Sequence, residues 1–207
     1  MTAQPSSAQP LSSQPLDTLS AIRERRTVPL PALRPDPVSD ELIEAVLAAA
    51  NWAPTHGRTE PWRFAVFTGE GRLRLADVLA QSLVLFRGQD APDPSAVEAE
   101  RQNKLKAPVW IVAAAQTPGE SKFPPFEDDW AAAAAIQNLL LAARSLGLGS
   151  KWISNAASMH PHTLQSLGFA PDARPLGLLY LGHVTEWPKG ERRPISEKVR
   201  WFRDGGA

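Results

Sequence analysis

The sequence of 207 residues contains no cysteine. This absence excludes disulfide scaffolds, thiol nucleophiles, iron–sulfur clusters and thiolate zinc sites. The four histidines form no His-Glu-x-x-His pair, so we expect no metal site. The 22 Lys and Arg residues balance 22 Asp and Glu residues, which leaves no net charge to attract nucleic acid or anionic lipid.

Glycine-rich binding motifs are also missing. No Gly-x-Gly-x-x-Gly follows a predicted strand, and neither a P-loop nor a Gly-x-Ser-x-Gly elbow occurs. Residues 147–149, Gly-Leu-Gly, come nearest, but they follow a predicted helix, so we interpret Gly147 as its cap. Rossmann, P-loop and hydrolase folds therefore have no motif to support them.

Segments that would direct the chain into or across a membrane are not evident. Residues 1–15 have too little apolar surface to offset the entropy of ordering, which predicts a disordered tail without the features of a signal or transit peptide. The apolar run over residues 130–146 is interrupted by Gln137, Asn138 and Arg144, so it is too short for a membrane span. We expect a cytoplasmic protein.

What is present is an alternation of helices with a few strands, which favours a single α+β or α/β domain. Asp17 is expected to cap the first helix, with Leu19 and Ile22 facing the core. Apolar spacing predicts helices over residues 18–26, 39–53, 73–86, 96–106, 130–146 and 161–167. Apolar runs predict buried strands at 64–68 and 109–115, a short strand at 151–154 and a further strand at 175–184.

A first candidate site is Arg25-Arg26-Thr27, at the end of the first predicted helix. Two guanidinium groups and a hydroxyl beside a backbone amide suit a phosphate monoester. The alternative is that the arginines only complement the negative end of the helix dipole. The pattern alone leaves both interpretations open.

The second candidate site is the polar loop over residues 53–64, Ala-Pro-Thr-His-Gly-Arg-Thr-Glu-Pro-Trp-Arg-Phe, which leads into a predicted strand. His56 and Arg58 could donate hydrogen bonds to the oxygens of a planar heterocycle. Trp62 and Phe64 are expected to pack beneath them in the core. A structural role for His56 is the alternative.

These two motifs, together with Trp152-Ile153-Ser154, resemble the FMN-dependent nitroreductases, most closely their small, YdjA-like branch. The resemblance extends over about residues 16–202 and implies an α+β three-layer sandwich, with a mixed, mainly antiparallel sheet flanked by helices. It further implies an intertwined homodimer with one FMN at each end of the interface. Residues 16–186 would form the FMN-binding domain, and the extension over residues 187–207 would pack on the partner.

The resemblance also assigns site residues. Those expected to bind one FMN from the same subunit are Arg25, Arg26, Thr27, Trp152, Ile153 and Ser154. His56 would reach the same flavin from the partner subunit. Arg193 would be a further phosphate contact, although a solvated basic turn is an equal alternative.

Two positions depart from the family pattern, because many relatives have Asn where this chain has Arg58 and Gln where it has Glu60. We predict that Arg58 places positive charge near the flavin pyrimidine, which would favour the anionic reduced cofactor. The nicotinamide donor is expected near the helix end formed by Arg144 and Gly147.

The activity implied by the resemblance is transfer of hydride from NADH or NADPH through bound FMN to a small acceptor such as a nitroaromatic or quinone, with ping-pong kinetics. FMN would carry the chemistry, so no catalytic side chain is expected. Residues 81–95 and 122–126 would line the acceptor pocket. The alternatives are a flavin reservoir or redox sensor with little turnover, and a cofactor-free structural domain.

Overall fold

The structure is a computed structural model that describes residues 15–88, 93–117, 119 and 122–203. The tail predicted over residues 1–15 lies outside this range except for its last residue. The helices are α1 (Thr18–Glu24), α2 (Asp40–Ala50), α3 (Gly71–Arg87), α4 (Pro94–Leu105), α5 (Pro125–Ser145) and α6 (Pro161–Ser166). The strands are β1 (Trp62–Thr68), β2 (Val109–Ala115), β3 (Leu148–Ile153) and β4 (Arg174–His183). Short 3₁₀ turns are η1 (Leu30–Ala32), η2 (His56–Arg58) and η3 (Ile195–Lys198).

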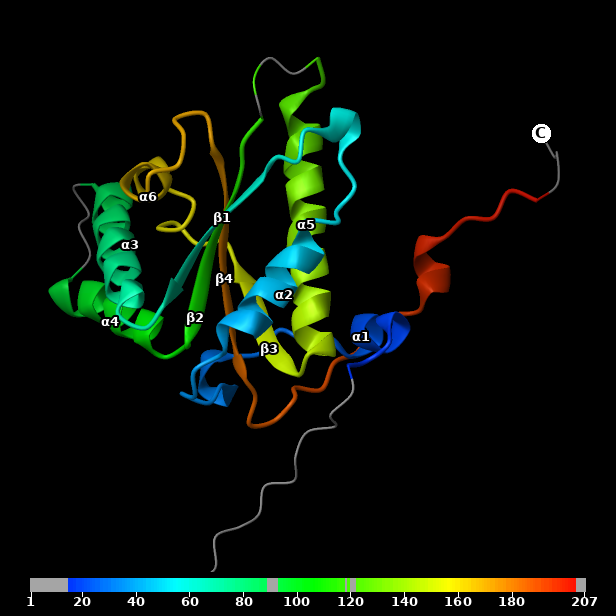
Figure 1. The fold of residues 1–207 in the computed structure, drawn as a ribbon, viewed down its shortest axis with the longest axis horizontal. Coiled ribbons are helices and arrows are strands. Elements are labelled where there is room, and N and C mark those ends of the chain that lie inside the picture. Colours follow the sequence, from blue (N-terminus) through cyan, green and yellow to red (C-terminus); the bar gives the residue numbers. More distant parts are fainter. Residues whose placement is uncertain (1–14, 89–92, 118, 120–121, 204–207) are drawn as a thin grey trace, which may run out of the picture.

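The four named strands form one sheet in the order β1-β2-β4-β3, and all of its strand pairs are antiparallel. A parallel contribution comes from an isolated bridge between Thr27 and Ser150 of β3. Helices α2 and α5 cover one face, while α3, α4 and α6 lie over the other (Figure 1). This is the three-layer α+β architecture that the family resemblance implies.

Strand β2 lies in the middle of the molecule and contributes to two apolar cores. Its side chains alternate between the two faces, as the period of a strand requires. Ile111 packs with α2 and α5, whereas Trp110 packs with α3 and α6. All seven residues of β2 are buried, so the prediction of a buried strand at 109–115 is confirmed with its bounds.

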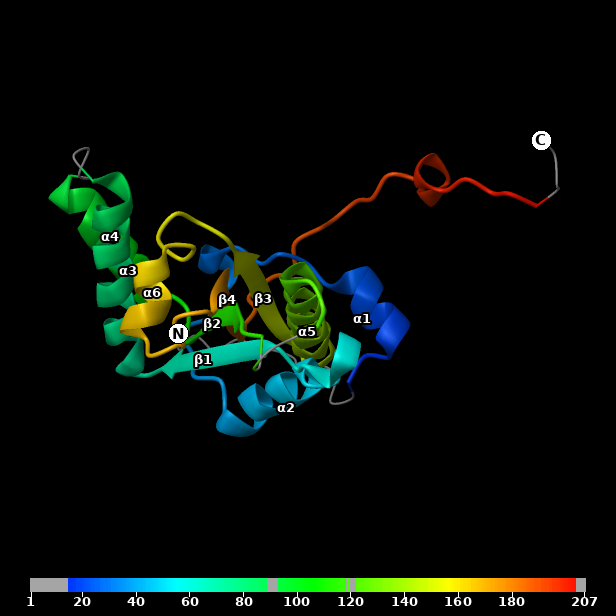
Figure 2. The same ribbon diagram turned by 90° about the horizontal axis from the view of Figure 1, so that it is seen from above.

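Helix α1 is confirmed with its predicted cap, because Asp17 Oδ1 accepts hydrogen bonds from the Leu19 and Ser20 amides at 2.9 and 3.1 Å. The prediction that Leu19 and Ile22 face the core is wrong. Leu19 is 62% exposed and Ile22 is 50% exposed, while Ala21 is the buried residue of this helix. The helix lies at the edge of the fold against the end of α5, so its large apolar side chains point outward (Figure 2).

Other details of the elements also differ from the sequence prediction. The first strand is a half-buried edge strand rather than a fully buried one, because only β2 flanks it. Helix α5 begins at Pro125, before residue 130, since proline and the acidic residues Glu127 and Asp128 are all favourable in a first turn. Strand β3 begins at Leu148, immediately after the turn at Gly147.

The C-terminal extension leaves the body of the protein after β4 and projects away from it (Figures 1 and 2). Its apolar side chains Ile195, Trp201 and Phe202 are 71%, 73% and 91% exposed. No helix among the described residues is long and apolar enough to cross a membrane. Trp187, at the start of the extension, packs against a core cluster of its own chain, whereas the apolar side chains further along are left uncovered by it.

Candidate functional site

The segment Arg25-Arg26-Thr27 follows α1 and runs along β3. Thr27 forms the parallel bridge with Ser150, and the Val28 amide donates a hydrogen bond of 3.0 Å to the Ser150 carbonyl. The hydroxyl of buried Tyr180 in β4 donates to the Val28 carbonyl at 2.6 Å. The sheet thus fixes the backbone immediately after the two arginines.

Positive charge accumulates around this segment. Burial lowers the pKa of Arg25 below its usual value, and the neighbouring charges of Arg192 and Arg26 lower it further. Within the described residues, no carboxylate forms an ion pair with any of these three arginines. Because their charges are not neutralised by the protein, the cluster suits a multiply charged anion such as a phosphate.

Arg26 is the most constrained member of this cluster. Its Nη1 donates to the carbonyls of Arg23 and Arg25 at 2.7 and 2.9 Å, and its Nε is buried without a hydrogen-bond partner. Gly190 of the extension lies against it, since a Cβ at that position would clash with Nε. The close approach of Gly190 is what lets the extension cover the guanidinium.

Arg192 was missed by sequence reasoning, which selected its neighbour Arg193. Both arginines are exposed, but the charge of Arg192 acts on Arg25, whereas the Arg193 carbonyl accepts a hydrogen bond of 3.1 Å from Lys198 Nζ. The two residues are identical in type and adjacent, so the sequence alone does not indicate which of them acts on Arg25. The assignment of Arg193 to the phosphate stays a prediction.

The end of β3 provides an aromatic surface close to the same edge of the sheet. Trp152 is 39% exposed, and its indole Nε1 donates to the Leu176 carbonyl at 2.7 Å. Ile153 is half-buried and Ser154 is exposed. Since Thr27 is bridged to Ser150, the structure brings the Arg25–Thr27 and Trp152–Ser154 motifs onto one strand edge.

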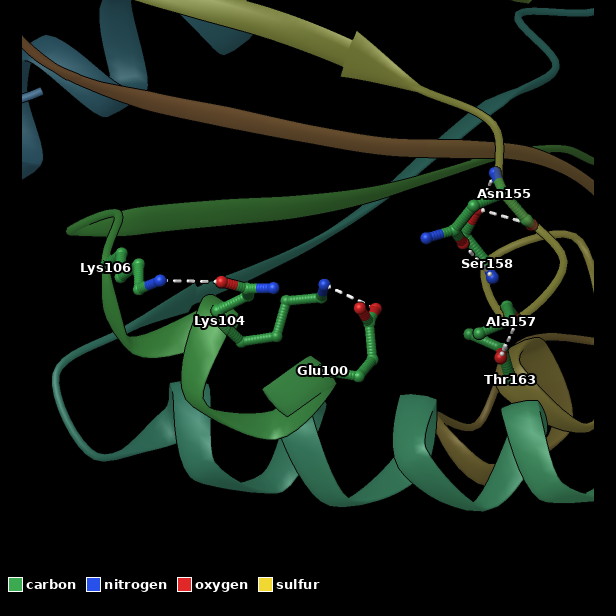
Figure 3. Close-up of polar contacts among 8 residues, drawn as sticks. Glu100, Lys104, Lys106, Asn155, Ala157, Ser158 and Thr163 are labelled. Carbon is green, nitrogen blue, oxygen red and sulfur yellow. Dashed lines mark hydrogen bonds and ion pairs between the residues drawn. The ribbon is translucent and has the colours of Figure 1, made fainter. Parts of the chain in front are cut away.

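The chain that follows β3 is held by a compact set of hydrogen bonds (Figure 3). Ser158 Oγ accepts from the Asn155 amide at 3.0 Å, and Asn155 Oδ1 accepts from the Ser158 amide at 2.9 Å. Thr163 Oγ1 in α6 donates to the Ala157 carbonyl at 2.7 Å. This turn fixes the direction in which Ser154 leaves the strand.

The His56 loop lies at the other end of the molecule, beside the first turn of α5 (Figure 1). His56 Nδ1 is 2.6 Å from Glu127 Oε2, and the imidazole stacks on Phe123 with the ring centroids 3.6 Å apart. Arg58 is exposed and has a positive φ of 56°, which is costly for a residue with a side chain. Trp62 is in the core and Phe64 is packed against it, as predicted.

Asp128 fixes this loop, and the sequence analysis did not select it as a site residue. It is buried, and its two oxygens accept hydrogen bonds from Thr59 Oγ1 at 2.7 Å and Thr117 Oγ1 at 2.5 Å. Thr59 Oγ1 is in turn 2.7 Å from Thr55 Oγ1. An acidic residue is common in a first helical turn, so the sequence carried no distinct signal for this role.

The two candidate sites do not meet within one chain. His56 contacts Glu127 at the start of α5, whereas Glu24, next to Arg25, forms an ion pair with Arg144 in the last turn. At 1.5 Å per residue, Glu127 and Arg144 are separated by about 26 Å along the helix. Within one chain the two candidate sites therefore lie near opposite ends of α5.

Arg144 and Gly147, where the nicotinamide contact is predicted, both have structural roles in this chain. Besides its ion pair with Glu24, the Arg144 guanidinium lies 3.8 Å from the centroid of the Trp187 ring. Gly147 has φ = 79° and donates to the Arg144 carbonyl at 3.1 Å, so its role as a helix cap is confirmed. A nicotinamide contact at these residues stays a prediction.

Comparison with known proteins agrees with the fold and the motifs. The sequence model of the Nitroreductase family matches residues 22–183. The "Putative NAD(P)H nitroreductase YdjA" of Escherichia coli (strain K12) is 30% identical over 167 residues, which cover 81% of this chain and 88% of that protein. The crystal structure of a nitroreductase-like family protein from Bacillus cereus superposes with a TM-score of 0.78 at 28% identity, covering 94% of this chain and all of that one.

A second crystal structure, of a nitroreductase from Desulfovibrio desulfuricans in complex with FMN, superposes with a TM-score of 0.69 at 26% identity. It covers 90% of this chain and 97% of that chain. The family match includes Arg25, His56 and Trp152, so both candidate sites lie within the region shared with these relatives. The chain belongs to the nitroreductase family.

Proposed function

We propose that this protein is an FMN-dependent oxidoreductase that passes hydride from NADH or NADPH to a small acceptor, such as a nitroaromatic or a quinone. The observation that carries the proposal is the cluster of Arg25, Arg26 and Arg192, whose charges no carboxylate among the described residues neutralises. A phosphate monoester carries up to about two negative charges and would complete this cluster. The name of YdjA and the FMN bound to the Desulfovibrio relative support the same ligand and activity.

The residues present fit FMN at both ends of a proposed site. The arginine cluster and Thr27 would hold the phosphate and ribityl chain, because guanidinium groups donate paired hydrogen bonds to phosphate oxygens. Trp152, Ile153 and Ser154, on the same edge of β3, would lie beside the flavin ring. When bound, FMN would supply the acceptance and release of hydride, so the side chains need only bind, orient and shield it.

We further propose that the site is completed in a homodimer, in which the FMN-binding domain over residues 16–186 is wrapped by the partner's extension over residues 187–207. Exposed apolar residues on one side of the protein support this: Leu19, Ile22, Trp52, Phe126 and Trp130. One of them, Trp52, lines a groove of about 360 Å³ between α1, α2 and the last turns of α5. Apolar surface of this kind marks an interaction site.

A homodimer would also bring the His56 loop of one chain close to the arginine cluster of the other. His56 lies about 26 Å along α5 from the end that contacts α1, so it would approach the flavin held by the other chain. Phe123, which stacks on His56, belongs to the segment predicted to line the acceptor pocket. Arg58 in the same loop is exposed and available to place positive charge near the flavin. Ping-pong kinetics and the cytoplasmic location stay predictions.

The direct test is a visible absorption spectrum of the purified protein after FMN addition and desalting, followed by NADH and then NADPH under anaerobic conditions. Fast bleaching of a retained flavin band would support the oxidoreductase and identify the preferred donor. Retention with only slow bleaching would favour the reservoir or redox sensor instead. Loss of all flavin on desalting would contradict the proposed site.

Replacing Arg26 by alanine provides the matching binding measurement. Charge-assisted hydrogen bonds contribute about 1.5–3 kcal/mol, so Arg26→Ala should raise the Kd for FMN about 10-fold to 100-fold in a fluorescence titration. Arg74→Ala is the control, because this exposed arginine lies on α3, on the opposite face of the sheet from α5. Equal affinity for FMN in the Arg26 variant and the control would overturn the phosphate assignment.

A further inference from the structure

We infer that Glu127 is a positioning residue that fixes the tautomer and ring orientation of His56, so that Nε2 is the ring nitrogen presented to the ligand. This inference rests on the proposed function for the identity of that ligand, the flavin. The geometry of the pair does not depend on it. Three features hold the imidazole: a contact at one edge, a contact at one face and the loop that carries the residue.

The edge contact determines the position of the proton. His56 Nδ1 lies 2.6 Å from Glu127 Oε2, which is a short hydrogen bond. An ionised carboxylate can only accept hydrogen bonds, so Nδ1 must be the donor and carry the proton. In the neutral ring Nε2 is then left with its lone pair and is a hydrogen-bond acceptor.

The face contact determines the orientation of the ring. Phe123 stacks on the imidazole with an interplanar angle of 28°. Phe123 reaches this position because residue 57 is glycine: a Cβ there would clash with Phe123 Cε2. With one edge on Glu127 and one face on Phe123, the other face and Nε2 are open, in agreement with the 58% exposure of the side chain.

The loop that carries His56 is fixed independently of Glu127. Asp128 holds Thr59 and Thr117 through its two oxygens. Asp129 is paired with Arg174 at 2.7 Å, so it does not compete for the histidine. Removing the Glu127 carboxylate should therefore free the imidazole without unfolding the loop, and the contribution of Glu127 becomes measurable on its own.

The functional consequence is that the tautomer of His56 decides whether Nε2 accepts or donates a hydrogen bond. With Glu127 in place, neutral His56 can accept a hydrogen bond from a ligand N–H group, which is the reverse of the donor role that the sequence analysis expects for this residue. Without the carboxylate, the proton is free to move to Nε2, and the same ring then offers a donor where the ligand needs an acceptor. Glu127 would thus act on the flavin only through His56.

The first experiment reads the tautomer directly, by NMR of the full chain with ¹⁵N-labelled histidine, both with and without FMN. His56→Ala assigns the resonance among the four histidines. We expect the Nδ1–H tautomer in the unmodified chain, and we expect it no longer to predominate in Glu127→Ala. The control is Glu98→Gln, which removes a carboxylate paired with Arg101 on α4 and should leave the tautomer unchanged. An Nε2–H tautomer in the unmodified chain, or an unchanged tautomer in Glu127→Ala, would overturn the inference.

The second experiment is a double-mutant cycle on FMN affinity. Loss of one oriented hydrogen bond predicts that Glu127→Ala raises the Kd for FMN about 10-fold in the unmodified chain and less than about 2-fold in the His56→Ala background. Equal losses in both backgrounds would show that Glu127 does not act through His56. If the tautomer result holds but His56→Ala leaves FMN affinity unchanged, the positioning of His56 stands and the proposed flavin contact fails.

Discussion

Strand β2 and the outer face of α1 and α5 are both rich in apolar side chains, but they differ in what covers them. Ile111 in β2 lies between two strands and under α2 and α5, and it is fully buried. Ile22 in α1 has the same side chain and is 50% exposed, as Trp130 on α5 is 66% exposed. An apolar pattern therefore does not by itself indicate whether the surface is buried by its own chain.

The difference follows from the position of each element in the fold. Hydrogen-bonded neighbours on both sides of β2 leave its side chains no route to solvent. Helix α1 contacts its own chain mainly through the end of α5. Its remaining apolar surface has no cover within the described residues of the chain, and under the proposed function the partner supplies it.

The largest effect should come from truncating the same side chain in the two regions. Ile111→Ala leaves a cavity in the core and should lower the free energy of unfolding by about 2–5 kcal/mol in urea titrations. Ile22→Ala should cost about 0.5 kcal/mol or less in dilute, monomeric protein, since surface substitutions have small effects. Equal losses for both variants at every protein concentration would mean that α1 is covered by its own chain.

Placing a charge on the exposed face should separate subunits without unfolding them. Trp130→Asp removes a large aromatic side chain from the proposed interface, and losses of about 2 kcal/mol or more are typical of such residues. The dimer dissociation constant should therefore rise about 30-fold or more in analytical ultracentrifugation. Leu85→Asp, on the 52% exposed side chain of α3, is the control and should leave assembly unchanged. A Trp130→Asp dimer of undiminished affinity would exclude this face from the interface.

A smaller loss of stability near neutral pH is expected from Tyr180, whose hydroxyl joins the core to the backbone beside the arginine cluster. Tyr180→Phe removes the hydrogen bond to the Val28 carbonyl and should cost about 1 kcal/mol. Burial raises the pKa of Tyr180 to about 12, above the usual value of 10. Between these values the unfolded chain releases the phenol proton while the folded chain keeps it, so stability is present below pH 10 and is lost as pH rises toward 12.

The pH profile of this variant sharpens the test. The Tyr180→Phe chain has no phenol to titrate at this position and so shows no such loss, and the difference in unfolding free energy between the two chains should shrink above pH 10. Parallel stability curves from pH 8 to pH 12 would contradict a buried, protonated Tyr180. The measurement is urea unfolding at matched pH values.

Much of the fold could be predicted from local patterns. The seven residues of β2 were bounded correctly, because a continuous apolar run between turn residues is typical of a central strand. The Asp17 cap and the Gly147 stop were also predicted, since each acts on backbone groups a few residues away. The direction of Leu19 could not be predicted, because it depends on where α5 lies.

The candidate site divides in the same way. The sequence by itself determined which residue types are available and predicted their use: Arg25 and Arg26 for an anion, and His56 in a polar loop for a planar ligand. Only the tertiary structure decided that Thr27 lies against β3, that Arg192 faces the cluster, and that Glu127 and Asp128 hold the loop. Residue type and local spacing are written in the chain, whereas contacts between distant segments depend on packing that no single segment specifies.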